Sequence, residues 1–210
     1  GGIYCSGPNL MLRDVEIYSC NADYGGGIYF RSDNDTLAVN CMISDCYGSD
    51  GGGGIYCNGN NVPVVSGCII KGCGSKSGGG IAITGPGARI DSCVIEQCSA
   101  NFDGSGGGLH ITGTGQTVIT RTGITGCTAP NAGAMYANVP VSLSECKVTG
   151  NDADNRGGGI WLDSVPSAVI SRCIIEGNNA NEAGGILAVN SVLDLGHCTV
   201  SWNNSFQGYG

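Results

Sequence analysis

Residues 51–73 read GGGGIYCNGNNVPVVSGCIIKGC, and this stretch decides the fold because its two ends recur along the whole chain. The first end is a glycine run followed by an aliphatic anchor, and the second is a block of the form C-x-I-x-x-C. The aliphatic anchors are Ile3, Ile28, Ile55, Ile81, Leu109, Met135, Ile160 and Ile186. The blocks begin at Val15, Cys41, Cys68, Cys93, Thr122, Cys146, Cys173 and Cys198. The anchors are spaced by 25 to 28 residues and the blocks by 24 to 29, and two motifs that keep a common period over eight repeats predict a solenoid.

Each repeat is predicted to contain three short strands. The first follows the glycines, where Ile55 and Cys57 point to one face and Tyr56 to the other. The second ends three residues before the block, and the third is the block itself. Gly, Asn, Asp, Ser and Pro fill the connections, and no segment has a helical period. We therefore expect an all-β, single-stranded solenoid: a right-handed parallel β-helix of about eight coils, because crossovers between parallel strands are almost always right-handed.

The whole of residues 1–210 is predicted to be one segment of this solenoid. The sequence opens on Gly1-Gly2-Ile3 and closes on Gly208-Tyr209-Gly210, without the polar or helical cap that a free solenoid needs. We expect a segment that is uncapped at both ends and that belongs to a longer array.

Composition excludes several classes of partner. The formal net charge is -8, and the nine Lys and Arg residues are scattered singly, whereas nucleic-acid binding needs a basic patch. No apolar run approaches the length of a membrane-spanning helix. We expect no nucleic-acid partner and no membrane insertion by this segment.

The last position of the block forms a column of related side chains. It reads Cys20, Cys46, Cys73, Cys98, Cys127, Asn151, Asn178 and Asn203. The asparagines are predicted to form an internal ladder of side-chain amides. For the 13 cysteines, buried thiols are favoured over disulfides, because stacked parallel Cβ vectors stay far apart, and over a metal site, because C-x-x-C pairs and nearby His are missing. No metal and no cofactor is expected.

The residue after each aliphatic anchor is the most prominent candidate for binding. Six of the eight coils carry a ring there, and we call this set the aromatic stripe: Tyr4, Tyr29, Tyr56, His110, Tyr136 and Trp161. Ala82 and Leu187 occupy the other two coils. The rings are expected to face outward, where they either stiffen the sheet by stacking or form a platform for sugar rings or a partner protein.

Catalysis is the main alternative, because pectate-lyase-like enzymes that degrade polysaccharides use the same architecture. Such enzymes need clustered carboxylates on one face. The close acidic pairs are Asp33 with Asp35 and Asp152 with Asp154, each predicted to lie in a loop without a companion in register. No catalytic residue is therefore expected. A self-assembling extracellular fibre subunit is the other alternative.

The two repeated motifs resemble those of the polymorphic outer-membrane-protein repeat family, which repeats G-G-A-[ILV] and F-x-x-N in surface-exposed β-helices. The counterparts are Gly25-Gly26-Gly27-Ile28 and Gly157-Gly158-Gly159-Ile160 for the first motif, and Val148 to Asn151, Ile175 to Asn178 and Val200 to Asn203 for the second. Ile or Val replaces the Phe, and five coils end in Cys rather than Asn. The resemblance implies an extracellular or cell-surface location and a non-catalytic, structural or adhesive function.

Overall fold

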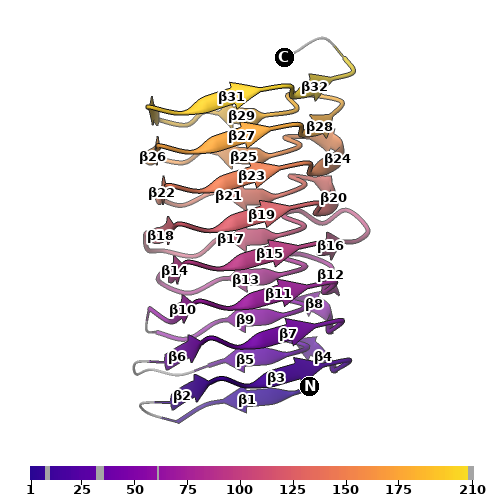
Figure 1. Cartoon of the computed structure of the whole chain (residues 1–210), viewed down its shortest axis with the longest axis vertical. Helices are drawn as coiled ribbons and strands as arrows, with labels where there is room; N and C mark the ends of the chain where they lie inside the picture. Colours follow the sequence, from indigo (N-terminus) through magenta and orange to yellow (C-terminus); the bar gives the residue numbers. More distant parts are fainter. Residues whose placement is uncertain (8–9, 32–35, 61, 208–210) are drawn as a thin grey trace.

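The computed structural model describes residues 1–7, 10–31, 36–60 and 62–207. All regular structure in these residues is β-strand, arranged as four parallel sheets of eight strands each. The chain visits the sheets in turn and then repeats the circuit one level higher, so that the coils stack into the column shown in Figure 1. The molecule is a parallel β-helix, as the repeat predicts.

Sheets A and B carry the first two strands of each coil. Sheet A contains β1 (Ile3–Cys5), β5 (Ile28–Phe30), β9 (Ile55–Cys57), β13 (Ile81–Ile83), β17 (Leu109–Ile111), β21 (Met135–Ala137), β25 (Ile160–Asp163) and β29 (Ile186–Val189). Sheet B contains β2 (Leu10–Arg13), β6 (Thr36–Val39), β10 (Val64–Ser66), β14 (Arg89–Asp91), β18 (Thr117–Thr120), β22 (Val141–Ser144), β26 (Ala168–Ser171) and β30 (Leu193–Gly196).

Sheets C and D complete the coil. Sheet C contains β3 (Glu16–Tyr18), β7 (Met42–Ser44), β11 (Ile69–Lys71), β15 (Val94–Glu96), β19 (Gly123–Thr125), β23 (Lys147–Thr149), β27 (Ile174–Glu176) and β31 (Thr199–Ser201). Sheet D contains β4 (Asn21–Tyr24), β8 (Tyr47–Gly51), β12 (Gly74–Ser75), β16 (Ser99–Ala100), β20 (Thr128–Asn131), β24 (Asp152–Arg156), β28 (Asn179–Ala180) and β32 (Asn204–Ser205).

The prediction of three strands per coil is wrong, because sheet D adds a fourth. Its strands are two to five residues long and run through the polar segment between the block and the next glycine run. Their inward side chains are small, as Ser75, Ala100 and Ala153 illustrate. A short strand that buries Ala or Ser lacks the contrast between apolar and polar positions by which the other strands are recognised.

The stacking of equivalent residues is confirmed. Ile28 pairs with Ile55 and Ile55 with Ile81 in the parallel register of sheet A, and all three are fully buried. Aliphatic residues from sheets A, B and C, with most of the cysteines, fill one continuous core along the solenoid axis. Because each side chain lies over its equivalent in the next coil, the core is a set of columns.

Glycines make the corner between sheets D and A. Gly52 has a φ of 60°, which L side chains rarely adopt, and a Cβ on Gly53 would lie 2.4 Å from the carbonyl oxygen of Gly74 in the next coil. Glycine is therefore required at Gly52 by conformation and at Gly53 by the close approach of two coils. The glycine runs are structural, and they fix the path of the chain just before the aromatic stripe.

No helix in the described part of the chain has the length and apolar character needed to cross a membrane.

Candidate binding face

The aromatic stripe forms two stacks of rings on the outer side of sheet A. In the first stack, Tyr29 contacts Tyr4 and Tyr56 edge to face, with ring centroids 5.2 and 5.1 Å apart. In the second, Tyr136 lies 5.0 to 5.1 Å from His110 and from Trp161. Each of these residues is the second residue of its strand in sheet A. Parallel pairing in register therefore places it beside the equivalent residue of the next coil. Ala82 separates the two stacks, since it pairs with Tyr56 on one side and His110 on the other.

A second column runs beside the stripe, and we call it the shoulder column. Its members lie five residues before the stripe position of each coil: Tyr24, Gly51, Ser77, Ser105, Asn131, Arg156 and Glu182. Strand pairing links neighbours in this column, for example Tyr24 with Gly51 and Arg156 with Glu182. Large members cover the stripe, as where the ring of Tyr24 lies 4.8 Å from that of Tyr56. Small members leave it open.

A hollow lies where both columns carry small residues. It has a volume of about 280 Å³ and is lined by Tyr56, Ala82 and His110 of the stripe, Tyr24, Gly51 and Ser77 of the shoulder column, and Asp50, Lys76 and Thr84 at its rim. A Cβ on Gly51 would lie only 3.2 Å from the ring of Tyr56, so glycine lets that ring form the wall. The hollow is therefore a direct result of Gly51, Ser77 and Ala82 coinciding in adjacent coils.

The polar groups around the hollow are available to a ligand. Asp50 and Lys76 are exposed, and neither forms an ion pair with another described residue. Thr84 Oγ1 lies at hydrogen-bond distance from the hydroxyl oxygen of Tyr56, 3.2 Å, and from the carbonyl oxygen of Cys57, 3.4 Å. Burial lowers the pKa of His110 to about 4, so its imidazole is neutral at physiological pH, and Ser105 Oγ lies at hydrogen-bond distance, 3.0 Å, from its Nδ1. The site thus combines flat walls with one group of each charge.

The six residues of the aromatic stripe differ widely in exposure. Tyr4 is 57% exposed, whereas Tyr56 is only 8% exposed because the ring of Tyr24 covers it. Tyr29, His110, Tyr136 and Trp161 are intermediate. The expectation of a uniformly exposed outer platform is therefore wrong for Tyr56, although every ring points away from the core. The sequence analysis did not identify Tyr24, Asp50, Lys76 or Thr84 as neighbours of the stripe. The one signal for this neighbourhood is the regular offset of the shoulder column, in which Tyr24 lies five residues before Tyr29.

Trp161 ends the second stack and carries a further polar feature. The guanidinium of Arg156 lies over its ring, 5.8 Å from the centroid. Its indole Nε1 is buried without a hydrogen-bond partner, one of two such side-chain atoms among the described residues. An unsatisfied buried donor is costly, by about 1 to 3 kcal/mol. Arg156 also pairs with Glu182 at 3.0 Å, so the cation is held in place over the ring.

The thirteen cysteines are all thiols, as favoured from the sequence, and eleven of them are buried. Burial raises the pKa of Cys57 to about 12 and also raises the pKa of Cys41, so these thiols are poor nucleophiles. In the block column, the amide of Asn151 donates to the carbonyl of Ile124 in the preceding coil, and the thiol of Cys127 is directed at the equivalent carbonyl of Ile95. Cysteine and asparagine thus have the same structural role in this column.

The asparagine ladder is present as predicted. Nδ2 of Asn151 donates to Oδ1 of Asn178 at 2.8 Å, and Nδ2 of Asn178 donates to Oδ1 of Asn203 at 2.9 Å. The same Oδ1 atoms accept from the backbone N–H groups of Asn151 and Asn178, at 3.0 Å in each case. The side-chain amides of Asn151 and Asn178 thus form hydrogen bonds with backbone groups next to the turn between sheets C and D and with one another. These hydrogen bonds leave neither amide available to a ligand.

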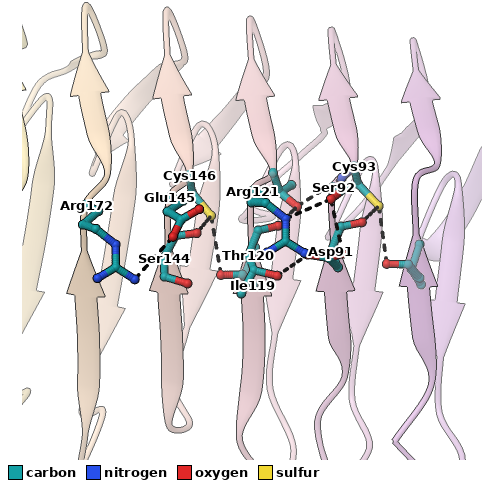
Figure 2. Close-up of polar contacts among 12 residues, drawn as sticks. Asp91, Ser92, Cys93, Ile119, Thr120, Arg121, Ser144, Glu145, Cys146 and Arg172 are labelled. Atoms are coloured by element: carbon teal, nitrogen blue, oxygen red, sulfur yellow. Dashed lines mark hydrogen bonds and ion pairs between the residues drawn. The ribbon is translucent and has the colours of Figure 1, made fainter.

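A polar corner between sheets B and C brings together charges that lie far apart in the sequence (Figure 2). Arg121 contacts Asp91 at 2.5 Å and Ser92 at 3.2 Å, and Arg172 contacts Glu145 at 3.4 Å. The Thr120 hydroxyl, which donates to Asp91, lowers the pKa of that carboxyl, and the Arg121 guanidinium adds to the effect. The acids here are occupied by cations from the next coil. We interpret this corner as an ion-pair ladder that ties adjacent coils together.

The two acidic pairs singled out in the sequence have different outcomes. Asp33 and Asp35 lie outside the described residues. Asp152 and Asp154 both lie on β24 rather than in a loop, and they border a cavity of about 380 Å³ together with Phe102 and Pro130. Among the described residues, no group of three or more His, Cys, Asp or Glu side chains is arranged to hold a metal ion.

Comparison with known proteins gives the family of the chain. A family model described as a right-handed β-helix region matches residues 1–102 and 53–210. Neither the curated proteins nor the solved structures gave a match. The two family matches overlap and together cover the whole chain, and they agree with the four parallel sheets described above. The chain therefore belongs to the right-handed β-helix family.

Proposed function

We propose that this chain is a non-catalytic, structural and adhesive segment of a secreted or cell-surface protein, and that its aromatic face contacts glycans. One observation carries the proposal: rings stacked on a rigid parallel sheet flank a hollow whose rim has unpaired polar groups. Sugar rings present apolar C–H faces and polar edges, and they suit a site with flat aromatic walls and a few placed hydrogen-bonding groups. The resemblance to polymorphic outer-membrane-protein repeats supports the surface location.

Binding to an immobilised panel of glycans tests this proposal. The variant to compare replaces Tyr4, Tyr24 and Trp161 by Ala, because Tyr4 and Tyr24 are exposed and Trp161 is partly exposed. The matched control replaces Tyr18 by Ala, since Tyr18 is 69% exposed but lies on sheet C. We expect the triple variant to lose most glycan binding and the control to keep it. Equal binding by all three proteins, or no binding by the unmodified chain, contradicts the proposal. Selective loss of a protein partner instead would reassign the face to protein binding.

The non-catalytic part of the proposal has its own test. The purified chain, incubated with soluble polysaccharides that include pectin, is expected to release neither reducing ends nor unsaturated sugars. Turnover of any of them would favour the pectate-lyase-like alternative, and the Asp152 and Asp154 pair would be the first carboxylates to replace.

End-to-end self-association into a fibre is the other candidate function that the repeat leaves open. Sedimentation over a range of concentrations tests it, and strictly monomeric behaviour would exclude a fibre of this chain.

A further inference from the structure

The outer face of sheet C carries an apolar strip that no described part of the chain covers. Met42, Ile69 and Val94 are the first residues of β7, β11 and β15, and parallel pairing places them side by side in adjacent coils. They are 43%, 38% and 42% exposed, whereas the middle residue of each of these strands is fully buried. Three large apolar side chains in a row on the outside of a sheet form a patch that a partner can bury.

The strands around this strip form a regular surface. In β3, β7, β11, β15, β19 and β23 the middle residue is buried, so the first and third residues point outward, and the pairing continues without a bulge. The outward residues therefore form two columns. The first column is Glu16, Met42, Ile69, Val94, Gly123 and Lys147, and the second is Tyr18, Ser44, Lys71, Glu96, Thr125 and Thr149.

Each column is complementary to itself when the order of the coils is reversed. A twofold axis that runs parallel to the strands, between β11 and β15, places a second copy face to face with its coils in the opposite order. β11 then faces β15 of the second copy, β7 faces β19, and β3 faces β23. The strand direction is the same in both copies, so each column faces its own counterpart.

Opposite charges meet in this arrangement. Glu16 faces Lys147 of the second copy, and within one chain neither forms an ion pair with another described residue. Lys71 faces Glu96 of the second copy, and the two side chains already pair at 2.9 Å within one chain. Four charges of alternating sign therefore gather beside the axis. Like charges do not face each other at any position of the two columns.

The shapes of the facing residues also match. Met42 faces Gly123, where an added Cβ would meet nothing within 4 Å, so the glycine leaves room for the long side chain. Ile69 faces Val94, which places the apolar contact at the axis. The surface is about 29 Å long, for six strands spaced by about 4.8 Å, and about 10 Å wide, for three residues at about 3.3 Å each. Since stable dimers bury about 800 Å² per partner, a surface of this size fits a weak dimer.

We propose that the outer face of sheet C, from β3 to β23, is the interface of a weak twofold dimer in which two copies of this chain lie side by side with opposite axes. This inference goes beyond the glycan contact proposed above and does not depend on it. Figure 1 shows the strands of sheet C in front of those of sheet A, and one core lies between them. The aromatic stripe therefore points away from this interface in both copies.

Sedimentation equilibrium of the whole chain, from about 1 μM to about 1 mM, tests the dimer in about 0.15 M NaCl, which screens the net charge of -8. We expect association that stops at two chains, with a Kd on the order of 100 μM. Ile69→Arg places a charge in the apolar contact and should weaken association by about tenfold or more. Val169→Arg is the matched control, because Val169 is a 37% exposed outward residue of sheet B, and it should leave the Kd unchanged.

A charge exchange tests the orientation of the two copies. Glu16→Lys alone and Lys147→Glu alone each create two like-charged pairs in their own dimers, and each should weaken association by about tenfold or more. In an equal mixture, the two variants can form a dimer in which both pairs again have opposite charges. Association should therefore recover in the mixture, which an effect on the fold of either variant would not produce.

The outcomes decide the proposal. A chain that stays monomeric up to about 1 mM overturns it, and so does association that Ile69→Arg and Val169→Arg affect equally. Growth beyond two chains that is insensitive to Ile69→Arg also overturns it, in favour of end-to-end assembly. A mixture of the two charge variants that associates no better than either variant alone overturns the twofold arrangement.

Discussion

Asn178 connects three coils through a single side chain. Its amide nitrogen donates to Val148 and Asn203, and its carbonyl oxygen accepts from both nitrogens of Asn151. Asn178→Ala leaves several buried groups unpaired, so we expect it to lower the free energy of unfolding by about 3 kcal/mol. Asn178→Cys should cost about half as much, because cysteine occupies this column in the first five coils.

Urea unfolding followed by circular dichroism compares the two variants. A midpoint for Asn178→Ala that equals that of the unmodified chain would contradict the ladder's contribution. A cysteine variant less stable than the alanine variant would contradict the equivalence of the two residues in the column.

His110 gives a pH dependence whose sign follows from its pKa. Burial lowers that pKa from 6.5 to about 4, so the unfolded chain binds a proton more readily than the folded chain between these values. The stability that the neutral imidazole contributes is therefore complete above pH 6.5 and is lost as the pH falls through about 4. His110→Gln removes this titration and keeps a polar side chain that can still bond to Ser105.

Melting temperatures between pH 7.5 and 4 measure the effect. The unmodified chain should lose more stability over this interval than His110→Gln does, because carboxylate titrations are common to both proteins. Parallel curves for the two proteins would show that His110 is not the group responsible.

At the scale of the element, the corner between sheets D and A depends on close approach of coils. A Cβ at Gly53 would lie 2.4 and 2.5 Å from two backbone oxygens, whereas a Cβ at Gly123 on β19 meets nothing within 4 Å. We expect Gly53→Ala to destabilise the fold by about 3 kcal/mol or more, because backbone must shift to accept it. Gly123→Ala is the matched control and should be neutral or slightly stabilising, since it also removes flexibility from the unfolded chain. Thermal melts of the two variants decide the point, and similar losses in both would refute the steric explanation.

Three of the four strands in each coil could be predicted from the sequence, because their inward residues are aliphatic and recur with the repeat. Ile55 and Ile70 mark sheets A and C in this way. Sheet D could not be predicted, since β12 and β16 bury only Ser75 and Ala100 in segments of polar composition. The aromatic stripe was predictable for the same reason as the core columns. The hollow was not, because it depends on the shoulder column, which approaches the stripe only through a turn that propensity does not specify.

At the scale of the molecule, the described strands pair only between adjacent coils, so the stability of the solenoid is distributed along its axis. Every strand pairs only with its equivalents in adjacent coils, as the order of each sheet shows. Stability in such an array is close to a sum of terms for each repeat and each interface. An interior coil therefore gains two interfaces and a terminal coil gains one. The burial of equivalent side chains in sheet B shows the same difference between interior and terminal coils. Ile119, Leu143 and Ile170 are fully buried, whereas Leu195 in the last coil is 44% exposed.

This gradient predicts a profile of hydrogen exchange. Amides of β9, β13, β17 and β21 should be the most protected, and protection should fall steadily toward β1 and β31, because local opening begins where an interface is missing. Exchange measured by mass spectrometry on peptides from each coil gives the profile directly. Uniform protection along all eight coils at low concentration would mean that the array unfolds as one cooperative unit, and the additive description of its stability would have to be abandoned.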